Sequence, residues 1–200
     1  MKLNMCLWVS GVFWAAAILS ACEKKATEQT EFTKADSVTG TYLSLQDTML
    51  QVWNTMIHDD NRKILAMDHL LEKLSMTNPE KSEELGNYQQ RLDELPGMRY
   101  DQQSISDPEV VTEYDFASNS LVTELIALAE SQRQFAHDKS LQKLVDSIRS
   151  ADQRVLNYRA EYDQVASRFN RFVEQHHDLL EGLTADSFVA RRPLFEMAAE

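Results

Sequence analysis

Residues 141–172 read LQKLVDSIRSADQRVLNYRAEYDQVASRFNRF, and this stretch decides the fold. Its apolar residues recur at alternating steps of three and four, the spacing that places side chains on one face of an α-helix. Neither glycine nor proline interrupts the pattern. We therefore predict a single helix from Ser140 to about Leu180, roughly 60 Å long at about 1.5 Å per residue. Its apolar face comprises Leu141, Leu144, Ile148, Ala151, Val155, Tyr158, Tyr162, Val165, Phe169 and Phe172.

A second long helix is predicted over residues 41–75. Its apolar spacing is interrupted at residues 58–63, where Asp60 occupies a position on the core-facing side. A carboxylate in a helical core must pair with a cation or stay near water. Two alternatives follow: the helix loosens so that Asp60 reaches solvent, or Asp60 pairs with a cation such as Arg154 or Arg159. The apolar face comprises Leu45, Met49, Val52, Met56, Ile64, Met67, Leu71 and Leu74.

Two shorter segments lie between these helices, and each opens with a cap residue followed by proline. Asn78-Pro79-Glu80 begins a helix that Pro96-Gly97 is expected to stop. Asp107-Pro108-Glu109 begins a third long helix, whose pattern breaks near residues 137–140, and Gly182 is expected to end the last helix. The two apolar faces comprise Leu85, Tyr88, Leu92 and Leu95, and Val111, Tyr114, Ser118, Leu121, Leu125 and Leu128.

The composition supports an all-α fold. The chain has only five glycines and four prolines, which argues against a turn-rich β-sandwich or barrel. We predict an elongated antiparallel helical bundle, with three long helices and one shorter helix, over residues 41–182. Residues 183–200 form a tail that we expect to dock through Phe188, Leu194 and Phe195.

The N-terminus has the pattern of a bacterial lipoprotein signal. Residues 1–22 have one early cation, an apolar stretch and the ending Leu19-Ser20-Ala21-Cys22, a lipobox. We expect residues 1–21 to be removed and Cys22 to carry fatty acyl chains such as palmitate. The alternative is an uncleaved membrane anchor, but about 14 to 16 apolar residues fall short of the roughly 20 that span a bilayer. Cys22 would be the one cysteine left, so no intramolecular disulfide is expected.

Residues 22–40 are rich in Thr, Glu, Lys and Ala, and we predict that they form a flexible tether. Two or three acyl chains on Cys22 suffice for stable membrane attachment. We therefore expect a lipid-anchored protein of the bacterial cell envelope. Because Glu23 replaces the Asp of the usual inner-membrane retention signal, the outer membrane is favoured in a cell with two membranes, on its periplasmic or surface face.

Few residues suggest chemistry. The net charge of −12 excludes nucleic acid as a partner, because phosphate binding needs clustered Lys and Arg. We identify no nucleophile motif, phosphate-binding glycine loop or paired carboxylates suited to catalysis, and predict no catalytic, cofactor or metal site. His176-His177 and His58-Asp59-Asp60 are interpreted as solvated surface. Arg154 and Arg159 are expected to pair with carboxylates of neighbouring helices.

The last two predicted helices resemble the LemA family of membrane-anchored helical-bundle proteins of bacteria. The family's glutamate, apolar seam, basic positions and paired aromatic-polar motifs are similar to Glu130, Leu141, Leu144, Ile148, Asp152, Arg154, Val155, Arg159, Tyr162-Asp163 and Phe169-Asn170. Its terminal Pro-x-Phe-Glu is similar to Pro193-Leu194-Phe195-Glu196. In the first helix, Trp53 and Arg62-Lys63 stand where the family has Trp and two basic residues.

This chain also departs from the LemA pattern. Asp68 and Gln132-Arg133 replace family prolines, Tyr162-Asp163 replaces a Tyr-Asn pair, and a lipobox replaces the usual transmembrane helix. The resemblance implies a helical bundle over residues 41–182 and attachment to the envelope, but no mechanism. Two functions remain open: a non-catalytic binding or scaffolding lipoprotein with an envelope protein partner, which we favour, and a ligand-binding or enzymatic bundle. An aromatic pocket near Tyr162 would be expected under the second function.

Overall fold

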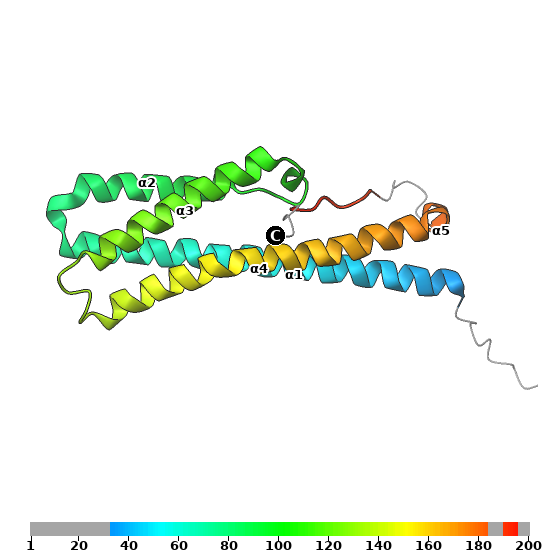
Figure 1. Ribbon diagram of the computed structural model, residues 1–200, viewed down its shortest axis with the longest axis horizontal. Helices are drawn as coiled ribbons and strands as arrows, with labels where there is room; N and C mark the ends of the chain where they lie inside the picture. Colours follow the sequence, from blue (N-terminus) through cyan, green and yellow to red (C-terminus); the bar gives the residue numbers. More distant parts are fainter. Residues whose placement is uncertain (1–32, 184–189, 196–200) are drawn as a thin grey trace, which may run out of the picture. The chain divides into compact units, whose positions relative to one another are not determined.

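The computed structural model describes residues 33–183 and 190–195, and no β-strand occurs in that part of the chain (Figure 1). The chain divides into two units, residues 1–33 and 34–200, and the second holds all the described helices. None of these helices is both long enough and apolar enough to cross a membrane. The helices are α1 (Lys34–Thr77), α2 (Ser82–Met98), α3 (Pro108–Glu130), α4 (Lys139–Gln175) and α5 (His177–Leu183), with short 3₁₀ turns η1 (Pro79–Lys81) and η2 (Ser104–Ser106).

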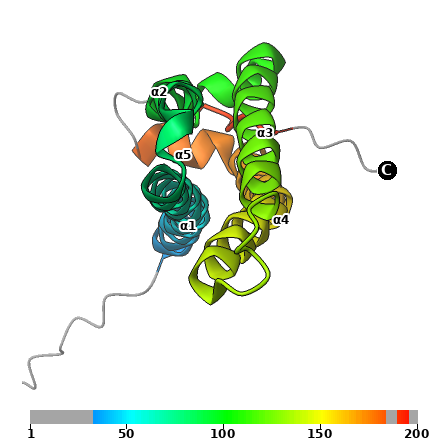
Figure 2. The same ribbon diagram turned by 90° about the vertical axis from the view of Figure 1, so that its left-hand side faces the viewer.

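Two long helices form the largest part of the helical unit. α1, with 44 residues, and α4, with 37, pack antiparallel along each other (Figure 1). α2 and α3 cover only the half that contains the end of α1 and the beginning of α4, where four helices surround one core (Figure 2). Over the other half, α1 and α4 pack with α5 and the segment Ala190–Phe195. The predicted all-α antiparallel bundle is confirmed.

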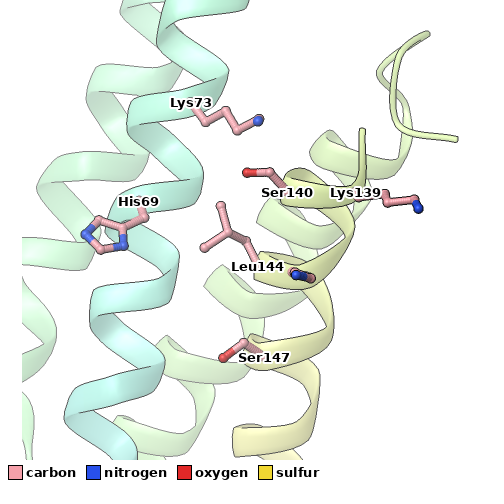
Figure 3. A pocket seen from close by; sticks show the side chains of 7 residues that line it. His69, Lys73, Lys139, Ser140, Leu144 and Ser147 are labelled. Atoms are coloured by element: carbon pink, nitrogen blue, oxygen red, sulfur yellow. The ribbon is translucent and has the colours of Figure 1, made fainter. Parts of the chain in front are cut away.

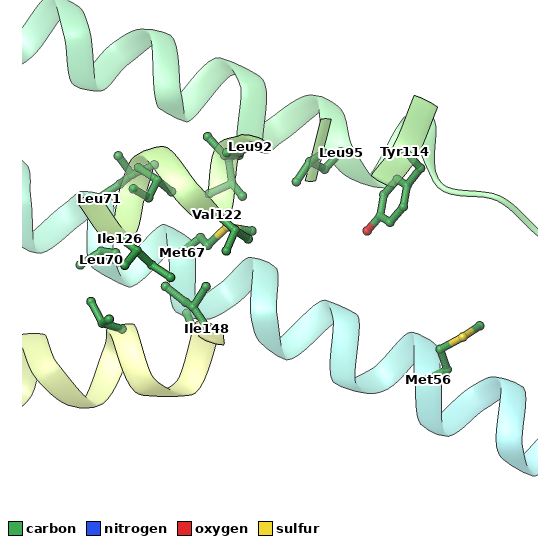
Figure 4. Packing of buried hydrophobic residues seen from close by; sticks show 14 of the residues in the cluster. Met56, Met67, Leu70, Leu71, Leu92, Leu95, Tyr114, Val122, Ile126 and Ile148 are labelled. Carbon is green, nitrogen blue, oxygen red and sulfur yellow. The ribbon is translucent and has the colours of Figure 1, made fainter. Parts of the chain in front are cut away.

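The core follows the apolar spacing of the sequence. One large cluster joins side chains of α1, α2, α3 and α4 (Figure 4). A smaller cluster lies where α1 begins and α4 ends. On α4, the predicted face is confirmed, although its members differ in burial: six are buried and four are partly exposed. The buried six are Leu141, Ile148, Ala151, Tyr162, Val165 and Phe169.

Aspartates cap two of the helices, and the sequence predicts the first of them, Asp107. The Asp107 carboxylate accepts a hydrogen bond from the backbone N–H of Glu109. The Asp138 carboxylate accepts hydrogen bonds from the backbone N–H groups of Ser140 and Leu141. Asn78 behaves differently, because its side-chain amide donates to the carbonyl of Leu74 and thus closes the end of α1. Asn78 does precede a helical turn that opens with Pro79, as predicted, but this turn is the 3₁₀ turn η1, and the Asn78 side chain does not cap it.

α1 begins earlier than expected, so residues 34–40 of the predicted tether are helical. The cause is Val38, which is buried against Phe169, Val173 and Leu180 at the other end of the chain. An isolated valine in a polar stretch gives no periodic signal, so the sequence could not indicate this contact.

Two predicted helix ends also shift. α2 continues through Pro96 to Met98, since a proline in the last turn removes only one late hydrogen bond. α4 ends at Gln175 instead of Leu180, and the short α5 follows after His176. Gly182 lies inside α5 and not beyond its end. The break at His176 accompanies the burial of Leu180 in the smaller apolar cluster.

Candidate functional site: a buried charged cluster and a docked segment

Asp60 is buried at the centre of the bundle. Its carboxylate forms an ion pair with Arg99, the residue directly after α2, at 2.7 Å, and a second with Lys63, one turn later on α1, at 3.3 Å. The hydroxyl of Tyr114 on α3 donates a hydrogen bond to the same carboxylate. The alternative that Asp60 pairs with a cation is therefore confirmed, although the cations are Arg99 and Lys63 and not Arg154 or Arg159. The alternative that Asp60 reaches solvent is wrong, and so is the interpretation of Asp59 and Asp60 as solvated surface, because both are buried.

Arg154 and Arg159 pair with carboxylates of neighbouring helices, as predicted. The Arg154 guanidinium donates two hydrogen bonds to Asp59 of α1, at 2.9 and 2.8 Å. The Arg159 guanidinium makes a bidentate contact with Asp115 of α3 and donates to the hydroxyl of Tyr100 at 3.0 Å. Burial lowers the pKa of Arg159, but the hydrogen bonds to Asp115 and Tyr100 and the charges of both groups together outweigh it, so the net shift of the pKa is upward.

Lys63 connects Asp60 to polar side chains of α3 and α4. Its ammonium, almost fully buried, donates to the hydroxyl of Ser118 at 2.8 Å and lies 3.5 Å from Asp152. A cavity of about 140 Å³ opens beside it between α1, α3 and α4, with Arg159 in its wall. Burial and the charge of Asp60 raise the pKa of Tyr114, which keeps the phenol protonated as a donor. The cluster neutralises its own charges, which suits a structural role.

A second feature is the docked segment Ala190–Phe195, which lacks helical structure (Figure 1). The side-chain amide of Asn170 on α4 hydrogen-bonds to both backbone polar groups of Arg192. Its Nδ2 donates to the carbonyl at 2.8 Å, and its Oδ1 accepts from the N–H at 2.7 Å. The carboxylate of Asp163, two turns earlier, accepts from the N–H of Phe195 at 2.8 Å. The backbone of the segment is thus held by three hydrogen bonds.

The ring of Phe195 enters an aromatic cage. It stacks on Trp53 of α1 with 6.2 Å between ring centroids and meets the edges of Tyr100 and Tyr162 at 5.4 and 5.7 Å. The Arg159 guanidinium lies 5.1 Å from its centroid, within cation–π range. The expected docking through Leu194 and Phe195 is confirmed, whereas Phe188 lies outside the described residues.

Sequence reasoning missed the roles of Asn170 and Asp163. One signal was present, because Asn170 directly follows Phe169 on the apolar side of α4, where a buried amide needs a hydrogen-bonding partner. The partner could not be named, since it is a backbone group of a distant segment.

A basic groove lies at the end of the unit where α4 begins. It measures about 780 Å³ and is lined by His69, Lys73, Lys139, Ser140, Lys143, Leu144 and Ser147. In Figure 3, Lys73 and Ser140 extend toward the same space, whereas Lys139 points away from it. Lys73 is already paired with Asp138 at 2.9 Å. In the described ranges, no group of three His, Cys, Asp or Glu side chains could hold a metal ion.

Cys22, the predicted lipidation site, and the predicted signal and most of the tether lie outside the described residues. The chain matches no model of a known protein family, no curated protein and no solved structure. The similarity to the LemA family therefore stays a prediction from the residues named above.

Proposed function

We propose that this protein is a lipid-anchored bacterial envelope protein whose helical bundle binds a protein partner and catalyses no reaction. The observation that carries the binding role is the groove that holds residues 190–195. There, side chains of α4 hydrogen-bond to the backbone of an extended segment, and an aromatic cage receives its last side chain. Backbone hydrogen bonds combined with a side-chain pocket are a recurrent way of recognising extended peptides.

The charged cluster supports a non-catalytic role. Asp59, Asp60 and Asp115 each pair with an arginine inside the bundle. A general acid or base must be within reach of a substrate, whereas these carboxylates are occupied by structural partners.

The lipid anchor rests on the lipobox ending in Cys22 and on the similarity to membrane-anchored LemA proteins. Growth with a clickable palmitate analogue tests it, because wild-type chain should incorporate the label and Cys22→Ser should not. The Cys22→Ser precursor should also keep residues 1–21. Equal labelling of both chains would rule out the anchor.

Ligand binding or enzymatic activity is the second candidate, and the polar cavity beside Lys63 is the feature that favours it. Thermal unfolding in the presence of metal ions and small polar metabolites separates the two, since a ligand that prefers the folded state raises the melting temperature. A saturable rise that Ser118→Ala removes would support this second function. No rise, together with site-specific crosslinking to one envelope protein, would support the first.

Photocrosslinkers placed by amber suppression give the partner test. A crosslinker at Gln103, on the rim of the groove, should trap a discrete envelope protein in intact cells. A crosslinker at Glu83, exposed on α2, is the matched control and should not. Equal products from both positions would contradict partner binding at the groove.

A further inference from the structure

The groove that holds residues 190–195 contains two buried polar groups to which its own segment makes no hydrogen bond. The hydroxyl of Tyr162 and Nε2 of Gln102 are buried, yet neither has a hydrogen-bond partner among the described residues. Buried polar groups in folded proteins are nearly always paired. These two atoms flank the docked segment, Tyr162 through its ring contact with Phe195 and Gln102 in the wall beside Pro193.

Open space lies on both sides of the segment, and Gln102 lines part of it. One groove of about 310 Å³ lies between Leu194 and the start of α3, at Pro108 and Val111. Another of about 570 Å³ lies between Pro193 and Gln102. A segment with other side chains at these two positions could fill more of the groove than the resident one does.

The hydrogen bonds that hold the segment do not depend on its side chains. Asn170 hydrogen-bonds to the backbone N–H and carbonyl of residue 192, and Asp163 accepts a hydrogen bond from the backbone N–H of residue 195. Specificity comes from the cage, which takes an aromatic ring, and from the basic residue at position 192, whose guanidinium lies 5.5 Å from the ring centroid of Phe169 on a chain with net charge −12. The chemistry that fits is thus a basic residue, proline, an aliphatic residue and an aromatic residue in succession.

We propose that this groove is a peptide-binding site that accepts an extended basic-Pro-aliphatic-aromatic segment of another protein. Residues 192–195 occupy it as an intramolecular competitor. The inference rests on the proposed binding role of the bundle and names the site and the class of partner. Because a tethered segment competes at an effective concentration of about millimolar or more, a partner peptide binds weakly until the resident segment is displaced.

The test measures binding of a fluorescein-labelled peptide, Ala-Arg-Arg-Pro-Leu-Phe with a capped C-terminus, to the full chain in detergent by fluorescence anisotropy. Arg192→Pro combined with Phe195→Ala displaces the resident segment, because the first removes the N–H that Asn170 accepts and the second empties the cage. This variant should bind the peptide at least about tenfold more tightly than the wild type, whose resident segment competes for the site.

Two controls make the site specific. Adding Asn170→Ala should weaken binding about tenfold or more, as removal of a central anchor does. Adding Asn157→Ala, an exposed asparagine of the same helix, should not. A peptide with alanine in place of phenylalanine should also bind at least about tenfold more weakly.

Circular dichroism checks that each variant is folded. If the double variant loses helix signal, Phe195→Ala alone carries the same predictions, because it empties the cage and so weakens the hold of the groove on the resident segment. Equal affinity for wild type and displaced variant, or no effect of Asn170→Ala, would overturn the proposal. Neither result bears on palmitate labelling of Cys22, so failure of this site and failure of the lipid anchor remain distinguishable.

Discussion

Asp60 shows how a long helix tolerates a carboxylate in its core-facing row. Arg99, Lys63 and Tyr114 surround the carboxylate with two cations and one hydroxyl donor. Burying a charge costs free energy that only good pairing offsets. Removing one partner of a buried ion pair therefore destabilises a protein more than replacing the whole pair by apolar residues does. The cluster therefore fixes how the end of α2 and the middle of α3 pack on α1.

Breaking the pair between Asp60 and Arg99 should destabilise the fold. We expect Asp60→Leu to lower the free energy of unfolding by about 3 kcal/mol, because two buried cations lose their carboxylate. Combining it with Arg99→Met should cost less than the sum of the single changes, with a coupling of about 1 kcal/mol or more. Urea unfolding followed by circular dichroism measures all three values.

Arg154→Met supplies the comparison for this cycle, because Arg154 contacts Asp59 and not Asp60. Its coupling to Asp60→Leu should be clearly smaller than that of Arg99→Met. The reverse order of the two couplings would mean that Asp60 pairs with α4 in solution.

The position of Asp60 could be predicted from helical spacing alone, but its partner could not. Arg99 follows α2 in a segment whose path no periodic pattern describes. Arg154 and Arg159 lie on a periodic helix, and their pairing with carboxylates of neighbouring helices was predictable for that reason. The cage around Phe195 was only partly predictable, because its walls come from three separate segments.

Buried tyrosines should make the fold sensitive to alkali. Burial raises the pKa of Tyr162 to about 12 from an unfolded value of 10.0. A raised pKa means that its contribution to stability is present below pH 10 and is lost as the pH rises through the folded value. The free energy of unfolding should therefore fall between pH 10 and 12. Tyr162→Phe should make this fall shallower in urea unfolding series, and an unchanged slope would contradict the assignment.

At the level of single elements, burial along α4 separates residues that the sequence treats alike. Ile148 is fully buried, whereas Leu144 is only partly buried and lines the open basic groove. Both positions belong to the predicted apolar face. The spacing predicts the face, but its edges depend on how far the neighbouring helices reach.

Alanine substitutions should reveal this difference. Ile148→Ala should cost about 2 to 5 kcal/mol of stability, because it leaves a cavity in the core. Leu144→Ala should cost distinctly less, since solvent can relax into the space it leaves. Glu83→Ala, on the exposed face of α2, should change stability by less than about 0.5 kcal/mol. Equal losses for Leu144 and Ile148 in urea unfolding would show that the groove beside Leu144 is closed in solution.

Element boundaries illustrate a different limit of prediction. Asp107 marks a helix start correctly because its signal is local: a side chain and a backbone N–H group two residues later. The start of α1 at Lys34 depends on the contact of Val38 with Phe169, and a contact between such distant residues leaves no local trace. The start of α1 could therefore not be placed from the sequence.

At the scale of the whole helical unit, the two halves differ in how many helices pack together. Four helices pack around the end of α1, whereas the beginning of α1 packs mainly on α4 and α5 (Figure 1). Residues 190–195 cover the core between these halves, over Trp53 and Tyr162. Local stability in proteins follows the number of packed neighbours.

Hydrogen–deuterium exchange should report this difference. Amides of residues 36–48 should exchange faster than those of residues 62–74, because fewer helices bury the first stretch. Phe195→Ala should accelerate exchange around residues 50–56 and 160–170 and leave residues 85–95 unchanged. Mass spectrometry of peptides from both proteins checks this, and a uniform increase along the chain would argue that residue 195 stabilises the whole fold and not its own neighbourhood.

The antiparallel pairing of α1 with α4 has a consequence for synthesis. Arg154 and its partner Asp59 are separated by 95 positions in the chain. The apolar row of α1 therefore leaves the ribosome long before its partner exists, and while it is uncovered it is a target for aggregation or for chaperones. Contacts this distant also slow folding, because closing a long loop costs entropy before any contact forms. This bundle should thus fold more slowly than helical bundles that pair neighbouring helices.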